Sequence, residues 1–543
     1  MKKAKRLVAV LLVLAMVFGL AACGPSGNGG NNAAPVNNAA ENNTNNAPSA
    51  PQPVYGGVLR MHCPSTATAL CNLIKSVGHG FIAGCVEALG KRDFITQEIS
   101  PWLADSWTFD DKTNTVTVKL HQGVKFHDGS DFNAEVVKWC NDLAKKNNRL
   151  STAHNFETEV VDNYTVKIIF DQFYLDWEQC ALTSVNYYSK EAYEKNGEEW
   201  FLSNPVGTGA FKFVEYIPNQ KVVYEKNENY WRKDANGNQL PYLDGYEAVI
   251  ITDQNAGMTA FINGEIDHLV GTDEAVIQQL IGNGFPNKCY VLPDSTTTFE
   301  VYANTVIKEN NPWADLNVRK AVFLYGIDWE DLTVLAGGKS AICTHSISLE
   351  NTLMYDPTFN DAYKYDLEKA KKMLADAGYP NGFDTELMTT AISKPCATVL
   401  QEKLKALGIN ANVTQVGGGD AKRYDPSIPG IEMWATTTNW DVTLRPLGSM
   451  HSPLDLGGSK TQGPVVKVDF SQEYRDLYAK TAAAKTLEER ADWGKKALRQ
   501  LYIEDVNSTL CYVKANAQFY SDKVHDAELE FNWSSPEVAW KEK

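Results

Sequence analysis

Residues with the spacing of a catalytic or metal-binding motif are few in this 543-residue chain. The stretch Gly337-Gly-Lys-Ser340 resembles half of a phosphate-binding P-loop, but Thr333 stands where the first glycine belongs. We therefore expect a turn there, after a helix that contains Asp331. His121 and His127 lie six residues apart across a strand and a turn, which suits surface residues better than metal ligands. No HExxH, GxSxG or paired-carboxylate motif stands out, which weakens an enzymatic function without excluding it, because catalytic triads are recognised in space.

Cys23 is the residue whose chemistry is best indicated by its surroundings. Four basic residues among the first six precede an uncharged apolar run over residues 7–22, which at about 16 residues is shorter than a membrane-spanning helix. This pattern predicts a secretory signal peptide over residues 1–22. Leu20-Ala-Ala-Cys23-Gly24 resembles the bacterial lipobox, so we expect a lipid such as palmitate on Cys23 and anchoring to the extracytoplasmic face of the cell membrane. Ordinary secretion with a chance cysteine is the alternative.

The residues after Cys23 predict a flexible tether. Residues 24–53 consist mostly of Gly, Asn, Ala, Pro and Ser, with Glu41 as their one charged residue. Such a composition cannot bury enough apolar surface to offset the ordering of the chain. We expect residues 23–53 to be disordered, with a root-mean-square reach of roughly 30 Å.

The remaining body of about 490 residues is large enough for two or three domain-sized cores. The formal charge of the whole chain is −16, and removal of the four basic leader residues makes it about −20. This acidic balance argues against a nucleic-acid partner. Ten cysteines, less the lipidated Cys23, leave nine at wide spacings. They favour several buried free thiols, with one or two disulfides as an open alternative, and argue against a zinc site.

Alternating apolar and polar residues predict strands in the first half of the body. Residues 107–109 and 116–120 alternate around a turn, as a hairpin does, and residues 160–170 repeat the pattern. Residues 133–145 favour a helix, and residues 207–231 begin a further strand pair.

Helical patterns dominate the second half. Val318, Ala321, Val322 and Tyr325 recur at the spacing of one apolar helix face. Asp366 can cap a helix that stops before Gly378, and Thr486 with Glu489 has the spacing of a capping box. Residues 512–531 return to strand character. The mixed order predicts α/β lobes without an internal repeat.

The order of short motifs along residues 55–520 resembles that of the family 5 extracellular solute-binding proteins, the dipeptide, oligopeptide and nickel binders of ABC importers. The motifs are Tyr55-Gly-Gly-Val-Leu59, Glu87-Ala-Leu89 with Pro101-Trp-Leu-Ala-Asp-Ser-Trp107, Leu120-His-Gln-Gly-Val-Lys-Phe-His-Asp-Gly129 with Asn133-Ala-Glu-Val-Val137, Pro205-Val-Gly-Thr-Gly-Ala-Phe211, Asn229-Tyr-Trp231, Gly264-Glu-Ile-Asp267, Leu316-Asn-Val-Arg-Lys-Ala321 with Gly326-Ile-Asp328, and Tyr365-Asp-Leu-Glu-Lys-Ala370 through Ala377-Gly-Tyr379. Each motif alone is weak, but their number and order make chance an inadequate explanation.

The resemblance implies a two-lobed clamp of the periplasmic-binding-protein type (type II, cluster C). Lobe I would comprise residues 54–290, with an extra subdomain near 91–204, and residues 506–543 would return to it. Lobe II would comprise residues 291–505. A solute bound in the cleft favours closure by its differential affinity for the closed form. The family implies no enzymatic activity, no cofactor and no metal, and a monomer that delivers its solute to an ABC permease.

The resemblance also places the solute site. In the peptide-binding members, an aspartate of a "W.ADY.DP" stretch in the second lobe meets the α-ammonium group of the ligand. The corresponding region here is Trp434-Ala-Thr-Thr-Thr-Asn-Trp-Asp-Val-Thr-Leu-Arg-Pro446. Asp441 would bind an amine through a charge-assisted bond, Arg445 would clamp a carboxylate, and Trp434 and Trp440 would stack on the ligand. Surface or core roles for these four residues are the alternatives.

The Ala-Asp-Tyr core of the family motif is missing from this stretch, which puts a standard peptide ligand in doubt. A short peptide remains the expected solute, followed by an oligosaccharide or a nickel complex. A lipid-anchored secreted hydrolase is the least favoured function.

Overall fold

The computed structural model describes residues 52–542 with gaps at 76, 94–97, 151–154, 286, 290–295, 346–352, 418–419, 439–450, 452, 455–463, 516 and 527–535. Residues 1–52 and 53–543 are separate units, and the fold described here is that of the second unit. Cys23 and nearly all of the expected tether lie outside the described residues. Within the described residues, no helix combines the length and the apolar character that crossing a bilayer requires.

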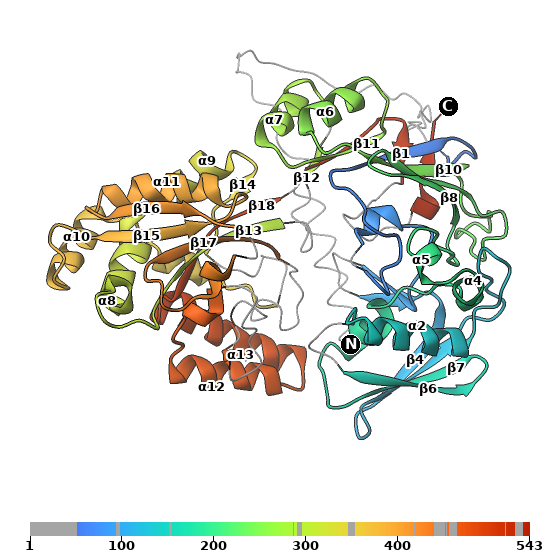
Figure 1. Ribbon diagram of the computed structural model, residues 1–543, viewed down its shortest axis with the longest axis horizontal. Helices are drawn as coiled ribbons and strands as arrows, with labels where there is room; N and C mark the ends of the chain where they lie inside the picture. Colours follow the sequence, from blue (N-terminus) through green and yellow to red (C-terminus); the bar gives the residue numbers. More distant parts are fainter. Residues whose placement is uncertain are drawn as a thin grey trace, which may run out of the picture. The chain divides into compact units, whose positions relative to one another are not determined.

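The first large sheet has seven strands in the order β12-β19-β11-β1-β10-β9-β8 (Figure 1). The strands are β1 (Val58–Cys63), β8 (Phe211–Ile217), β9 (Lys221–Lys226), β10 (Gly245–Ile250), β11 (His268–Gly271), β12 (Asn287–Cys289) and β19 (Ala517–Tyr520). β1 pairs in parallel with β10 and β11, and the other pairs are antiparallel. Helices α6 (Gln254–Ile262) and α7 (Glu274–Gly282) cover one face of this sheet, where Leu269 and Phe519 are buried.

A smaller antiparallel sheet of four strands has the order β4-β5-β7-β6. Its strands are β4 (Ala104–Asp110), β5 (Thr115–Leu120), β6 (Phe156–Asp162) and β7 (Thr165–Phe170), accompanied by helices α2 (Ala134–Lys146), α3 (Trp177–Thr183), α4 (Lys190–Asn196) and α5 (Glu198–Phe201) and by the short pair β2 (Gly90–Arg92) and β3 (Ile99–Pro101). Both predicted hairpins and the predicted helix are confirmed. Asn133 caps α2 by accepting the Val136 N–H at 3.1 Å.

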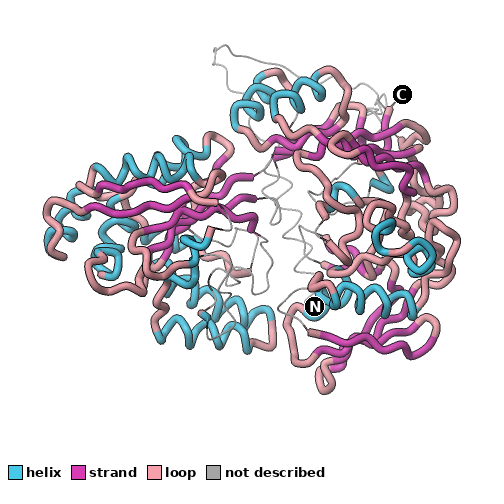
Figure 2. Tube along the Cα trace, in the orientation of Figure 1, coloured by secondary structure: helices cyan, strands magenta, loops and turns pink. Residues whose placement is uncertain are grey.

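The second large sheet has six strands in the order β14-β18-β13-β17-β15-β16. They are β13 (Thr296–Ala303), β14 (Ala341–Ile342), β15 (Asp384–Thr389), β16 (Asn410–Gln415), β17 (Ile431–Thr438) and β18 (Ser508–Ala515). Helices lie on both faces (Figure 2). One face packs on α8 (Leu316–Arg319), α9 (Trp329–Gly337), α10 (Leu367–Asp376) and α11 (Lys394–Lys405), and the other on α12 (Gln472–Ala483) and α13 (Leu487–Arg499).

The helix predictions for the second half are confirmed with two local differences. Val318, Ala321 and Val322 are buried as expected, but the helix continues past α8 as a π-helix over Lys320–Gly326. The hydroxyl of Thr486 accepts the Glu489 N–H at 3.1 Å, as a capping box requires. The Glu489 carboxylate instead accepts the N–H of Lys485 at 3.0 Å, one residue before the expected donor.

The chain passes between the two large sheets at two places. It leaves the first sheet after β12 and enters the second with β13, and it returns between β18 and β19. β18 pairs with β13, whereas β19 pairs with β11, so the return to the first sheet begins after Ala515. The last described segment also belongs to the first lobe, because Trp540 is part of its core and Lys541 pairs with Asp267 at 2.7 Å. The expected α/β fold of two lobes is confirmed.

The cysteines contribute thiols to the cores. The structure describes the side chains of eight cysteines, all of them are free, and all except Cys343 are buried. Burial raises the pKa of Cys63 to about 12, so this thiol is a poor nucleophile. The expected buried free thiols are confirmed, and no disulfide joins the cysteines that the structure describes.

Candidate functional site

Trp434 is the one predicted solute-binding residue that lies among the described residues. It belongs to β17, where it stands opposite Glu300 of β13, and its side chain is half-buried. The guanidinium group of Arg423, from the short 3-10 helix Ala421–Tyr424, lies 3.6 Å from the centre of the Trp434 ring. This stacking fixes one face of the indole. Trp440, Asp441 and Arg445 lie outside the described residues.

Arg423 belongs to a buried group of three charged side chains. Its Nε donates to Oε1 of Glu432 at 2.8 Å, and Nζ of Lys467 donates to Oε2 of the same carboxylate at 3.3 Å. None of the three side chains is more than 3% exposed. Burial lowers the pKa of Lys467, and the nearby Glu432 charge opposes this shift. One buried carboxylate thus neutralises part of the charge of two buried cations, and the group orients Arg423 against Trp434.

A second buried polar network surrounds Glu300 on the same face of the sheet. Its carboxylate accepts hydrogen bonds from Tyr302 at 2.7 Å, Tyr502 at 2.8 Å and Ser508 at 2.7 Å, and Nε2 of His451 lies 3.2 Å from Oε1. All five residues are fully or almost fully buried. Burial by itself raises the pKa of Glu300, but the electrostatic interaction with His451 and the hydrogen bonds outweigh burial, so the pKa is lowered.

The Glu300 network anchors the chain next to the predicted solute-binding residues. Tyr474 of α12 donates a hydrogen bond to the carbonyl of His451 at 2.8 Å, while the other end of the intervening segment is fixed by β17, which ends at Thr438. The stretch that contains Trp440, Asp441 and Arg445 therefore connects two firmly bonded points of lobe II.

Glu300, His451 and Ser508 are the residue types of a hydrolytic triad, but their arrangement does not suit nucleophilic catalysis. The Ser508 hydroxyl donates to the carboxylate at 2.7 Å and not to the histidine, whereas an activated serine must bond to its general base. All three residues are also almost completely buried, so a substrate cannot reach them. The network has the properties of a structural anchor.

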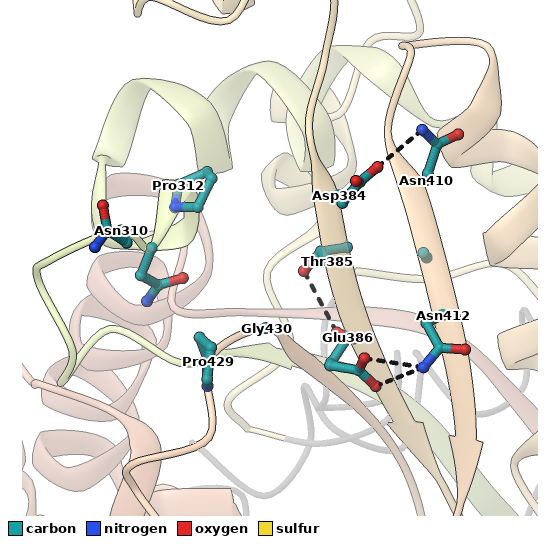
Figure 3. A pocket seen from close by; sticks show the side chains of 11 residues that line it. Asn310, Pro312, Asp384, Thr385, Glu386, Asn410, Asn412, Pro429 and Gly430 are labelled. Carbon is teal, nitrogen blue, oxygen red and sulfur yellow. Dashed lines mark hydrogen bonds between the residues drawn. The ribbon is translucent and has the colours of Figure 1, made fainter.

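A polar hollow of about 590 Å³ lies elsewhere on the second sheet (Figure 3). Asp384 accepts from Asn410 at 2.9 Å, and Glu386 accepts from Asn412 at 2.9 and 3.1 Å. The hollow is at the amino ends of the parallel strands β15, β16 and β17, whereas the predicted solute-binding segment follows the carboxyl end of β17. The hollow adjoins the start of β17 and the predicted segment follows its end, and the carboxylates of the hollow are already bonded to amides.

The motifs first considered for chemistry have structural partners. His127 is half-buried, its Nε2 lies 2.9 Å from the carbonyl of Gly209, and desolvation of its ring lowers its pKa to about 4. His121 lies against the ring of Trp231 and 4.0 Å from Asp105. The Gly337–Ser340 stretch forms the predicted turn at the end of α9, with Gly338 as the C-cap.

The sequence did not reveal the buried glutamates. Besides Glu300 and Glu432, Glu87 of the first lobe is 5% exposed, and burial raises its pKa. Its carboxylate accepts hydrogen bonds from Trp102, Thr208, Tyr230 and Trp231 at 2.7–3.1 Å. The sequence does carry one signal, a glutamate with apolar residues on both sides, as in Phe299-Glu-Val301 and Ile431-Glu-Met433. Such a glutamate indicates a paired carboxylate in the interior, because unpaired glutamates are seldom buried.

Comparison with known proteins agrees with this fold. Residues 98–453 match the family described as "Bacterial extracellular solute-binding proteins, family 5 Middle". The glutathione-binding protein GsiB of Pectobacterium atrosepticum is 31% identical over 394 residues, covering 68% of this chain and 73% of that protein.

Solved structures share the fold. HbpA2 of Haemophilus parasuis superposes with a TM-score of 0.75 at 19% identity, over 90% of this chain and 100% of that one. DppA of Helicobacter pylori, a periplasmic binding protein in complex with the peptide STSA, superposes with a TM-score of 0.70 at 21% identity, over 90% of this chain and 99% of that one.

The family match covers more than half of the chain. GsiB is more than 30% identical to this chain over more than two thirds of its length. Proteins of this kind are extracytoplasmic binding components of transporters and carry out no chemical conversion. The chain therefore belongs to family 5 of the bacterial extracellular solute-binding proteins, which capture small solutes for ABC importers, and it is not an enzyme.

Proposed function

We propose that this protein captures a short peptide with a free amino terminus between its lobes and presents it to its permease from a lipid anchor at Cys23. The observation that carries the proposal is the fixed position of Trp434, with Arg423 stacked 3.6 Å from its ring centre, at the start of the segment expected to hold the ligand. The relatives support a peptide, since their names or titles mention glutathione, the peptide STSA and the dipeptide Met-Leu.

The proposed site divides the recognition of a peptide among three kinds of group. Asp441 binds the α-ammonium group, Arg445 binds a carboxylate, and Trp434 and Trp440 contact the apolar parts. A charge-assisted bond inside a closed cleft is stronger than a neutral one, so the termini set the orientation of the peptide. The protein acts as a monomer, with residues 54–290 as lobe I and the second sheet with its helices as lobe II.

Two other solutes remain as second candidates within the same function. A related structure is NikA of Brucella suis in complex with Fe(III)-EDTA, and a metal complex or an oligosaccharide would bind without a free amine. A native mass spectrum of the purified, untagged protein identifies any solute that stays bound during purification, and it distinguishes these classes by mass.

Asp441→Ala should weaken the binding of a free-amine peptide by at least about 1 kcal/mol, because the ammonium group loses its charged acceptor. Isothermal titration with Ser-Thr-Ser-Ala provides the measurement, and the N-acetylated peptide is the control. The acetylated peptide should bind both proteins equally weakly. Equal affinity of wild type and variant for the free-amine peptide would remove Asp441 from the site.

Cys23→Ser should release the protein from the membrane, because lipid chains are attached through the thiol and the signal peptidase of lipoproteins requires the cysteine. The intact mass of the wild-type protein should exceed that of the chain from residue 23 by its acyl groups, and the protein should sediment with membranes. A wild-type protein without added mass, found in the soluble fraction, would show that the chain is secreted without an anchor.

A further inference from the structure

Glu274 binds residues of the other lobe. It is the first residue of α7, which covers the first sheet. Its Oε1 accepts the backbone N–H of Lys339 at 3.0 Å, and its Oε2 accepts the hydroxyl of Ser340. Nζ of Lys514, from β18 of the second sheet, lies 3.9 Å from Oε2. Three groups of lobe II thus hold one carboxylate of lobe I.

The turn that receives Glu274 is the Gly337-Gly-Lys-Ser340 stretch. Gly338 has φ +78°, and a Cβ atom at this position would come within 2.4 Å of Cγ and 2.5 Å of Cδ of Glu274. Only glycine combines this backbone conformation with so close an approach of the carboxylate. Because the turn follows the carboxyl end of α9, the helix dipole opposes a negative charge there. The N–H, the hydroxyl and Lys514 offset that cost.

This interlobe contact is next to one of the two places where the chain passes between the sheets. Lys514 pairs with Ala341 of β14 and precedes by only a few residues the return into β19, which starts at Ala517. A second interlobe contact is remote from it in the sequence: Nζ of Lys485, between α12 and α13, lies 4.4 Å from the ring centre of Phe173, which follows β7. Among the residues that the structure describes, the lobes therefore have these two polar connections besides the crossing strands.

We propose that Glu274 determines solute affinity without touching the solute, by fastening lobe I to the Gly338–Ser340 turn in the arrangement of the lobes that binds solute. Every acceptor contact that it makes with lobe II is broken when the lobes move apart at this point. A group with contacts in one arrangement only shifts the equilibrium between arrangements by the free energy of those contacts. Less of the binding free energy of the solute is then needed to close the lobes, so the apparent affinity for the solute rises.

The inference holds for any solute of the cleft and needs no particular ligand. Glu274→Ala removes the contact, and Ser340→Ala removes one donor from the other side. Glu368→Gln is the matched control, because Glu368 is also a glutamate in the first turn of a helix, α10, and its partner Lys371 belongs to the same helix.

Two measurements on the mature protein test the proposal. Small-angle X-ray scattering of the solute-free protein should give a larger radius of gyration for Glu274→Ala than for wild type and Glu368→Gln. Hydrogen exchange of the Lys339 amide should be about tenfold or more faster in Glu274→Ala, because the amide loses its acceptor. Binding of Ser-Thr-Ser-Ala or glutathione should weaken about three- to tenfold in Glu274→Ala and less in Ser340→Ala.

The outcomes separate this inference from the choice of solute. If neither probe binds wild type, the peptide proposal fails, and the scattering comparison alone decides the role of Glu274. Identical scattering curves for wild type and Glu274→Ala overturn the inference. Faster exchange at Lys339 together with unchanged scattering and affinity also overturns it, because the contact would then be local and without influence on the lobes.

Discussion

Replacing Glu432 by alanine should lower the free energy of unfolding by about 3–5 kcal/mol, because it leaves two cations without their counter-charge in the interior. Arg423 and Lys467 both bond to this one carboxylate, and all three side chains are almost fully buried. Without it, the guanidinium and ammonium groups repel each other in a medium that screens poorly. Urea denaturation followed by tryptophan fluorescence gives the difference as a shift of the midpoint.

A second substitution separates the charge effect from the loss of packing. Glu432→Gln with Lys467→Met removes one anion and one cation together, and it should be more stable than Glu432→Gln alone by about 1 kcal/mol or more. Glu386→Gln is the control, because Glu386 lies on the neighbouring strand β15 and its carboxylate accepts hydrogen bonds from the uncharged side chains of Asn412 and Thr414. A loss below about 1 kcal/mol in Glu432→Ala would mean that the buried charges are compensated by other groups.

Glu300→Gln should remove about 2–3 kcal/mol of stability near neutral pH and should make the remaining stability less sensitive to acid. Glu300 has a lowered pKa in the folded protein. Its contribution to stability is therefore present above the ordinary glutamate pKa and is lost as the pH falls through the lowered value. The variant lacks this titration, so the curves of wild type and variant should converge in acid.

The contribution of Glu87 to stability should depend on pH in the direction opposite to that of Glu300, so Glu87 provides a control for this experiment. Burial raises its pKa, although four hydrogen bonds to the carboxylate oppose the shift. Its contribution is thus present below the ordinary pKa and is lost as the pH rises through the raised value. Denaturation midpoints measured from about pH 3 to pH 8 should show the difference between wild type and Glu300→Gln growing with pH. A difference that stays constant over this range would contradict an ionised Glu300 in the folded protein.

Much of the fold follows from local patterns in the sequence. The hairpin of β4 and β5 and the cap at Thr486 are set by residues that are neighbours in the chain, and each was predicted where it occurs. The helix that starts after Asn133 was predicted as well, but the cap at Asn133 was not. The insertion of β19 between β11 and β12 was not predictable in the same way. It brings residues about 250 positions apart in sequence into register, as in the pair His268 and Tyr520, and no local signal encodes such a pairing.

The site was predictable from the sequence only in part. The family resemblance indicates the segment that starts at Trp434, which stays a prediction, whereas the buried charges beside Trp434 were missed. Strand alternation places Glu300 and Tyr302 on one face of β13, and Phe299 and Val301 on the other. From the sequence alone, a carboxylate on the first face suggests that this face is exposed to solvent. The helices α12 and α13 cover that face, and the partners of Glu300 come from residues 451, 502 and 508, which only the tertiary fold brings together.

The late return of the chain to the first sheet has a consequence for folding during export. β12 pairs with β19 in the described sheet, and Trp540 completes the core of the same lobe. The chain emerges from the membrane amino terminus first, so some 200 further residues emerge after β12 before β19 and Trp540 follow. The second lobe, from β13 to β18, is then already complete. The lobe that emerges first is therefore expected to be the last to acquire its native structure, and its unpaired strand edge is exposed to chaperones or to misassembly in the interval.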